Sequence, residues 1–324
     1  IHCDNKSFPI INNNTVTGNG NSSWLYCTDN TSNPTITGNK FNGNVDKSLR
    51  LGPQFQMTNN SFSGSVNKGI EVYTATLANI DLHWYKQTGE SIYIILSSPQ
   101  SYLTLNEHAS LTIDPGITLK FQSGSGLWLG TSYRGGGSVI ANGTASEQIL
   151  FTSSSGNSGG WKGIVFTNYS DNNTSSSLTH CVIENGGQKN DRDVSANIYC
   201  EETNTPNLSH SIIRNSIGHA IYLKKSSPTI AQSSLSNNNT SAVIQLTDES
   251  NPSISNCTIT GNGSSYWLYC AENSCNPQLV ENSFGGSVDR SLRLGPQFQM
   301  TNNSFTGNIN QGIEIYTATL ASEY

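Results

Sequence analysis

Charged residues are scarce in this chain of 324 residues, at 12% of the total, about half the share of a usual soluble domain. Lys and Arg number 16 against 22 Asp and Glu, so no basic excess exists to neutralise phosphates, and we expect no nucleic-acid binding. The best apolar run, residues 92–96, is far shorter than the ~20 residues of a membrane helix, so we expect no membrane insertion in this segment. Glu, Lys and Ala are few, which argues against helical bundles and coiled coils. Asn, Ser, Thr and 30 Gly are abundant instead, and this composition predicts a β-rich fold with many turns.

The chain contains a long internal repeat. Residues 48–62 (SLRLGPQFQMTNNSF) recur unchanged as residues 291–305, an offset of 243 residues. We therefore predict two parts: residues 1–77 as the C-terminal rungs of one unit, and residues 78–324 as a second unit. Within the second unit, residues from about 78 to 125 are expected to form an opening and capping region. Because the sequence starts in the middle of the pattern, we expect it to be a piece of a longer protein.

A shorter rhythm runs inside each unit. An apolar residue is followed by Asn, a second apolar residue, a turn and an apolar pair, as in Ile36-Thr-Gly-Asn39-Lys-Phe41 with Leu49-Arg-Leu51. Such short alternating stretches between Gly, Asn and Pro are typical of short strands between tight bends. A rung of about 21–25 residues cannot bury its apolar face alone, so we expect rungs to stack ~4.8 Å apart into one column. Side chains in the same bend would then form a structural ladder, made of Asn14, Asn39, Asn60, Cys257, Asn282 and Asn303.

These rungs resemble those of right-handed parallel β-helix repeat proteins, the solenoids shaped like pectate lyases. The resemblance rests on rungs such as residues 36–44 and 254–262, and on residues 111–121 (LTIDPGITLKF), which are similar to the opening rung of secreted members. It covers nearly the whole chain and implies an all-β fold, a right-handed parallel β-helix, in a secreted or surface protein built of tandem units. Enzymes, adhesins and structural fibres share this fold, so the resemblance does not choose between them.

Candidate catalytic residues are few. The one local concentration of charge is Asn190-Asp191-Arg192-Asp193, with Glu184, Lys189 and the pair His180 and His210 expected nearby. Two Asp flanking an Arg supply too few oxygens for calcium, and two His make a poor zinc site. We therefore predict a solvated loop, a stacked His pair, and no catalytic, cofactor-binding or metal site.

The seven cysteines leave two disulfide pairings open. Cys3 and Cys27 stand one rung apart, within reach of a disulfide, and Cys270 and Cys275 form a second possible pair. Both pairs differ between the copies, because Leu246 replaces Cys3 and Ser32 replaces Cys275. A feature that differs between copies is not expected to be the framework of the fold.

Asn-x-Ser/Thr triplets are numerous, as an Asn-rich chain makes many by chance. Several fall at expected bends, where a covalent glycan would project outward without disturbing the column. The candidate glycosylation sites are Asn5, Asn13, Asn21, Asn30, Asn59, Asn142, Asn168, Asn172, Asn207, Asn238, Asn256, Asn262 and Asn302.

The long repeat is the strongest indication of function. Enzymes rarely need near-identical large units in series, whereas a fibre does, and a head-to-tail contact that does not close makes a filament. We predict a structural segment of a long extracellular or cell-surface fibre whose main partner is itself, with no cofactor. The alternative is an adhesin or carbohydrate-binding module that uses an outward stripe of Tyr26, Tyr199, Tyr222 and Tyr269. Ranked below it is a polysaccharide lyase, epimerase or hydrolase centred on Asp191 and Asp193.

Overall fold

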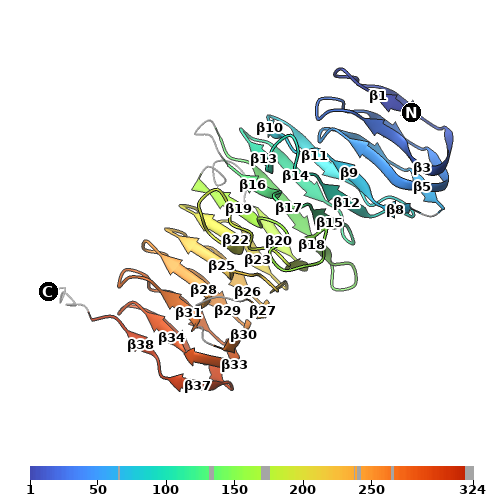
Figure 1. Cartoon of the computed structure of the whole chain (residues 1–324). Helices are drawn as coiled ribbons and strands as arrows, with labels where there is room; N and C mark the ends of the chain where they lie inside the picture. The colour runs from blue at the N-terminus through green and yellow to red at the C-terminus, as the bar shows by residue number, and fades with distance from the viewer. Residues whose placement is uncertain are drawn as a thin grey trace.

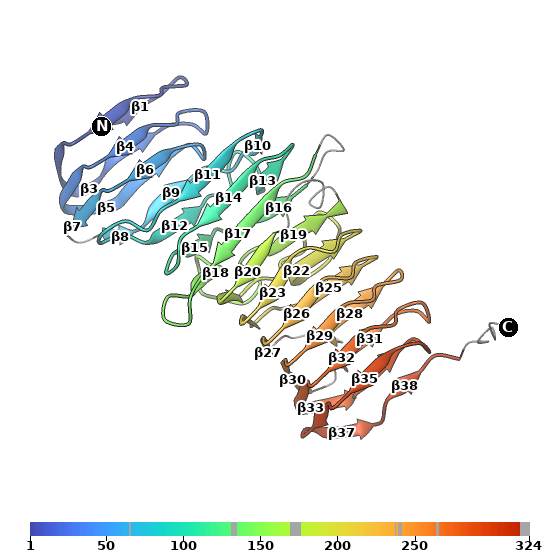
Figure 2. The ribbon, with the colours of Figure 1, turned by 180° about the vertical axis from the view of Figure 1, so that it is seen from behind.

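The chain folds into a parallel β-solenoid. The computed structural model describes residues 1–64, 66–130, 135–168, 176–236, 238, 242–263 and 266–317. Figures 1 and 2 show one elongated column with β1 at one end and β37 and β38 at the other. In the described residues the elements are strands and turns with no α-helix, and neighbouring strands pair in parallel. This confirms the predicted fold class.

The largest sheet has 16 strands and runs along the whole column. Its members are β1 (His2–Cys3), β3 (Thr15–Cys27), β5 (Lys40–Leu51), β7 (Ser61–Ser63), β8 (Val66–Lys68), β9 (Ile70–Val72), β12 (Ile92–Ile95), β15 (Thr118–Phe121), β18 (Ile149–Ser153), β21 (Cys181–Glu184), β24 (Ile212–Arg214), β27 (Ser234–Ser236), β30 (Thr258–Gly263), β33 (Ser283–Arg290), β36 (Ser304–Phe305) and β37 (Asn308–Gln311).

A sheet of 10 strands forms the second side. It consists of β10 (Thr76–Ala78), β13 (Tyr102–Asn106), β16 (Gly126–Leu129), β19 (Ile164–Thr167), β22 (Ala196–Glu201), β25 (His219–Lys224), β28 (Ala242–Thr247), β31 (Tyr266–Cys270), β34 (Leu292–Leu294) and β38 (Glu314–Ile315).

The third side is a sheet of nine strands, which a sheet of three strands precedes in the N-terminal rungs. β6 contacts β11, so the two sheets follow one another along about 12 turns. The nine strands are β11 (Asp81–Trp84), β14 (Ser110–Ile113), β17 (Ser138–Asn142), β20 (Ser177–Thr179), β23 (Asn207–Ser209), β26 (Thr229–Ala231), β29 (Ser253–Ser255), β32 (Gln278–Val280) and β35 (Gln299–Thr301), and the three are β2 (Ile10–Asn12), β4 (Thr35–Thr37) and β6 (Gln56–Thr58).

Like residues stack on like residues inside the column. Ile36 pairs in register with Ile11 on one side and Met57 on the other, and all three are buried. The rings of Phe41 and Phe62 stack with centroids 4.9 Å apart, which is the spacing of neighbouring parallel strands. A rung therefore buries its apolar side chains against the rungs above and below it.

The bend before the largest sheet carries side-chain ladders. The backbone N–H of Asn14 donates to Oδ1 of Asn39, and that of Asn39 donates to Oδ1 of Asn60, each over 2.9 Å. Gln87 extends this ladder, because its Oε1 accepts the N–H of Asn60. In the second copy the N–H of Cys257 donates to Asn282 and that of Asn282 to Asn303, again over 2.9 Å.

The two copies of the long repeat occupy different sheets at one point. β9 and β38 correspond in sequence, yet β9 lies in the 16-stranded sheet, where Ile70 pairs with Tyr93, and β38 ends the 10-stranded sheet, where Glu314 pairs with Arg293. The change occurs where β10 follows β9 and begins the 10-stranded sheet, which β13 continues. The central turns beyond this point are longer than 21–25 residues, because β11, β14, β17 and β20 start at residues 81, 110, 138 and 177.

Residues 78–125 contain β11 to β15 and lie partway along the column, between other rungs. β12 pairs with β9 of the preceding rung and with β15 of the following one. The segment that we predicted as an opening and capping region thus has paired strands on both sides and connects the two copies without a linker.

Candidate functional site

A groove lies on the outer face of the 10-stranded sheet. Along it, one outward position per rung forms a row: Trp128 pairs with Val165, Val165 with Tyr199, and Tyr199 with Tyr222. The ring of Tyr102 meets that of Trp128 edge-on, with centroids 5.0 Å apart. These side chains form a small apolar cluster separate from the core of the column.

The connection from β21 to β22, residues 185–195, places charged side chains beside this row. The Asn190 side chain holds the connection in shape, because its Oδ1 accepts the backbone N–H groups of Arg192 (2.9 Å) and Val194 (3.1 Å). Val194 packs on the aromatic cluster. Arg192 consequently lies over the Trp128 ring, with its guanidinium carbon 5.7 Å from the ring centroid, a distance typical of a cation–π contact.

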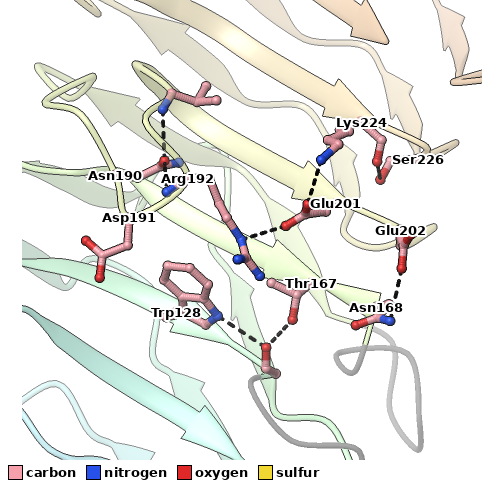
Figure 3. Close-up of polar contacts among 12 residues, drawn as sticks. Trp128, Thr167, Asn168, Asn190, Asp191, Arg192, Glu201, Glu202, Lys224 and Ser226 are labelled. Carbon is pink, nitrogen blue, oxygen red and sulfur yellow. Dashed lines mark hydrogen bonds and ion pairs between the residues drawn. The ribbon is translucent and has the colours of Figure 1, made fainter. Parts of the chain in front are cut away.

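Glu201 joins two cations at the centre of the groove. Its carboxylate accepts Arg192 Nε over 2.8 Å and Lys224 Nζ over 3.1 Å, as Figure 3 shows. Hydrogen bonding to Glu201 raises the pKa of Lys224, and the negative charge of Glu201 acts in the same direction. Glu202, the next residue, pairs with Lys225 (3.2 Å) and accepts from Asn168 (3.2 Å).

Two hollows meet at Arg192 and Glu201. One, of about 270 Å³, is also lined by Trp128, Thr167 and Glu202. The other, of about 400 Å³, extends along the sheet past Tyr222. Together they make an elongated depression with aromatic rings on its floor and paired charges on its walls, and ligand sites commonly combine apolar surface with a few placed polar groups.

The predicted acidic pair separates in the structure. Asp191 pairs with Lys162 over 2.6 Å, and its backbone N–H donates to the Tyr102 hydroxyl over 3.2 Å. Asp193 pairs instead with Lys189, and both side chains are largely exposed. Burial raises the pKa of the Tyr102 hydroxyl, and the Asp191 carboxylate acts in the same direction.

Glu184 was expected near Asp191, but it lies on another sheet. It ends β21 in the 16-stranded sheet and pairs with Arg214 over 2.7 Å. His180 and His210 do stack, with ring centroids 4.8 Å apart. No group of three or more His, Cys, Asp or Glu that could hold a metal ion occurs in the described ranges.

The predicted tyrosine stripe is only partly correct. Tyr199, Tyr222 and Tyr269 follow one row of the 10-stranded sheet, with Gln245 between the last two. Tyr26 lies in the 16-stranded sheet, where it pairs with Arg50. Tyr199 is buried, at 2% exposure, so it supports the groove floor and offers no ring to a ligand.

Sequence reasoning missed most of the groove. Trp128, Glu201 and Lys224 come from three different rungs, and Tyr102 and Lys162 support the connection from below. Trp128, Tyr199 and Tyr222 occupy the same outward position of successive strands. This shared position becomes visible only once the register of the strands is known.

The candidate glycosylation sites differ in accessibility. Asn59 and Asn302, equivalent in the two copies, are exposed at bends with φ of 55° and 53°. Asn238 is 1% exposed and its Oδ1 accepts the N–H of Ser216; this candidate is corrected, because a glycan needs an accessible amide nitrogen. Asn172 and the side chain of Asn21 lie outside the described part. The remaining candidates are half-buried (Asn30, Asn168) or exposed (Asn5, Asn13, Asn142, Asn207, Asn256, Asn262).

Parallel strands on three sides of a column, wound rung upon rung around one apolar interior, define a parallel β-helix protein. The family described as "Right handed beta helix region" matches residues 138–322, more than half of the chain, and the chain belongs to this family. The family includes enzymes and proteins without enzymatic activity, so membership does not assign a reaction. No curated protein and no solved structure matches the chain. Within the described ranges no helix is long and apolar enough to cross a membrane.

Proposed function

We propose that the chain is a structural segment of a long, repetitive extracellular or cell-surface fibre in which successive units continue one β-helix. The observation that carries this proposal is the pairing across the boundary between the copies. Ile94 pairs with Glu71, and the N–H of Leu96 donates to the Val72 carbonyl over 2.9 Å. A boundary closed by backbone hydrogen bonds has no flexible linker, and a solenoid of this kind is rigid along its axis.

Self-association along the axis follows from the same geometry. Each rung presents the backbone groups of its strands to the next, so a unit added in register covers edges that would otherwise attract other strands. The main partner is therefore the protein itself. The low charge and the exposed triplets at Asn59 and Asn302 suit a hydrated outer surface that carries covalent glycans.

Electron microscopy of tandem chains tests the proposal. Chains of one, two and three units should appear as straight rods whose length grows by a constant step per unit. Antibodies raised against the segment should label the surface of intact cells of the source organism. Beads on a flexible string, or labelling confined to permeabilised cells, would contradict the fibre function.

A second candidate function is carbohydrate binding in the groove on the 10-stranded sheet. It is favoured by the rings of Trp128 and Tyr222, which line the two hollows, and by the Arg192–Glu201–Lys224 network, which offers donors and acceptors to sugar hydroxyls. In a glycan-array measurement, Trp128→Ala and Arg192→Ala should each abolish any binding seen with the wild type. The matched control is Arg293→Ala, which removes a similar cation–π contact with Tyr269 (5.3 Å) on the same sheet but outside both hollows. Absence of wild-type binding would exclude this function.

We also propose that the groove is not catalytic. General acid–base catalysis needs a carboxyl group poised to exchange a proton, whereas Asp191, Glu201 and Glu202 each have a cationic partner within 3.2 Å. Wild-type protein should not degrade uronate polymers. Degradation that Asp191→Ala abolishes would overturn this proposal.

A further inference from the structure

Cys27 and Cys270 are the same position in the two copies, and both are buried at the end of a strand. Their surroundings correspond closely. One rung further on, the backbone N–H of Gly52 donates to the Ser32 carbonyl over 3.0 Å and that of Gly295 to the Cys275 carbonyl over 2.9 Å, and each of these N–H groups lowers the pKa of the thiol beside it. Burial raises the pKa of Cys27 to about 12.

Each of these thiols has a second thiol beside it, but from a different direction. Cys27 pairs in register with Cys3 of the preceding rung, and each of these thiols influences the pKa of the other. Cys270 has Leu246 at that register position, and its thiol instead lies close enough to that of Cys275, across the following turn, for each to shift the pKa of the other.

The replacements are complementary. The first copy has Cys3 and Ser32, and the second has Leu246 and Cys275 at the equivalent positions. The cysteine that accompanies Cys27 or Cys270 stands at a different position in each copy, but each copy has one such cysteine. Both copies therefore share a pair of neighbouring cysteines, although the paired positions differ.

We propose that Cys3–Cys27 and Cys270–Cys275 are two redox-closable thiol pairs, each of which forms a disulfide when a disulfide oxidant such as glutathione disulfide is supplied. The Cα atoms of register partners on neighbouring parallel strands lie ~5 Å apart, within the range that a disulfide bridges. The contact of Cys270 with Cys275 brings the second pair equally close.

Cys275 is the attacking group of its pair. The neighbouring Cys270 thiol lowers the pKa of Cys275 most, and the backbone N–H groups of Ser250 and Glu249 act in the same direction. A thiolate is the nucleophile in thiol–disulfide exchange. Both thiols are fully buried in the folded chain, so the exchange takes place while the chain folds: Cys275 attacks one sulfur of glutathione disulfide and releases one glutathione thiolate. Cys270 then loses its proton and attacks Cys275 sulfur, which releases the second. Two protein thiols are oxidised, one glutathione disulfide is reduced, and both protons end on glutathione.

Two other cysteines serve as internal comparisons. The thiol of Cys181 donates to the Ala141 carbonyl over 3.2 Å, and that of Cys257 donates to the Ser255 carbonyl over 3.2 Å. Their hydrogen bonds go to the backbone, so the geometry assigns them no disulfide.

Peptide mapping tests the proposal. The full chain is unfolded with reductant, refolded either in glutathione redox buffer or with reductant, alkylated in denaturant, and digested with trypsin and a Glu-specific protease. Cleavage after Lys6 separates Cys3 from Cys27, and cleavage after Glu272 separates Cys270 from Cys275. The redox-buffer sample should contain these two linked peptide pairs and the reduced sample neither. Seven alkylated cysteines after refolding in redox buffer, or equal linkage to Cys181, Cys200 or Cys257, would overturn the proposal.

Two substitutions taken from the other copy are matched controls. Cys275→Ser introduces the residue that the first copy has at Ser32, and Cys3→Leu introduces the residue that the second has at Leu246. Each should remove one linkage, keep the other, and leave the former partner alkylated, with an unchanged circular dichroism spectrum. Persistence of Cys270 in a linked peptide after Cys275→Ser would contradict the assignment.

Discussion

The side-chain nitrogen of Asn39 donates to Oδ1 of Asn60 over 3.1 Å, while the backbone N–H of Asn39 donates to the same oxygen over 2.9 Å. Asn282 and Asn303 repeat this relationship at 3.0 and 2.9 Å. A single amide oxygen thus accepts two hydrogen bonds from the preceding rung. The contact occurs in both copies, so an Asn in the bend holds neighbouring rungs at the same spacing in each of them.

Replacing this amide should destabilise the column. Asn39→Ala removes a side-chain donor from the carbonyls of Ile11 and Thr37, although the Thr37 carbonyl still accepts the N–H of Asn13 over 2.9 Å, and it leaves the N–H of Asn14 without its acceptor. Buried unsatisfied groups cost about 1–3 kcal/mol each, so we expect a loss of about 3 kcal/mol in the free energy of unfolding, measured by urea denaturation.

Two further variants sharpen this test. Asn39→Ser should cost less, because Ser211 fills the same kind of slot and accepts the N–H of Cys181 over 3.0 Å. Asn12→Ala, at an exposed strand position whose side chain is not part of the ladder, should change stability little. Equal stability of Asn39→Ala and Asn12→Ala would show that the ladder does not stabilise the fold.

The apolar interior should depend on two equivalent tryptophans. Trp24 and Trp267 are almost fully buried, and each Nε1 donates to a backbone carbonyl, that of Asn42 over 2.8 Å and that of Gly285 over 2.7 Å. Large-to-small changes of this kind cost about 3–5 kcal/mol. We expect Trp24→Ala and Trp267→Ala to lower unfolding stability by that amount in denaturant titrations. A loss below about 1 kcal/mol in only one of the variants would mean that the two copies are not packed alike. This threshold is close to the free energy of burying a single methylene group.

His219 should make stability depend on pH. Burial lowers the pKa of His219, and the ring nitrogen Nδ1 lies 2.8 Å from the Ala242 carbonyl. The unfolded chain therefore binds the proton more readily, so stability is complete above the unfolded pKa of about 6.5 and falls as the pH drops below it. Urea midpoints at neutral and mildly acidic pH should differ less in His219→Asn than in the wild type. The control is His2→Asn at an exposed position, which should keep the wild-type difference; an identical pH response of His219→Asn and wild type would refute the role of His219.

Glu90 should act in the opposite sense. It lies in a hollow of about 500 Å³ on the 16-stranded sheet, and burial raises the pKa of its carboxyl group above the ordinary value. The folded state holds the proton more tightly, so stability falls as the pH rises through the unfolded pKa of about 4.3 toward the folded one.

Glu90→Gln should therefore raise the melting temperature at neutral pH relative to the wild type, while the advantage shrinks in acid. The amide oxygen of Gln can still accept the Ile92 N–H that Glu90 Oε1 accepts over 2.9 Å. Differential scanning calorimetry at several pH values measures the effect, and Glu147→Gln on the exposed surface serves as the control. A lower melting temperature of Glu90→Gln at neutral pH would show that the charged form is stabilising.

The ladder and the rungs could be predicted because both depend on local spacing. An Asn three residues after Ile36 and a second apolar residue two positions further on place one side chain in the bend and the other in the core, whatever the rest of the chain does. The groove could not be predicted in this way. Arg192 reaches Trp128 and Glu201 only because residues 185–195 fold back over the 10-stranded sheet.

The tyrosine stripe shows where pattern and pairing diverge. Tyr26 and Tyr269 are equivalent in sequence, and the repeat alone puts them in one row. The row of Tyr26 continues through Glu71 to Ile94 in the 16-stranded sheet, whereas Tyr269 lies in the 10-stranded sheet that β10 begins, so the two residues lie on different sheets.

Sequence periodicity by itself determined the class of fold, the stacked rungs and the residues of the apolar interior, because each rung repeats the same alternation and can bury it only against its neighbours. Which rung-distant side chains share an outer surface was decided by tertiary structure alone. Outward side chains need not pack against the next rung, so the sequence pattern does not specify which of them are neighbours. The pairing of the strands and the path of the connection at residues 185–195 determine which charges and rings meet.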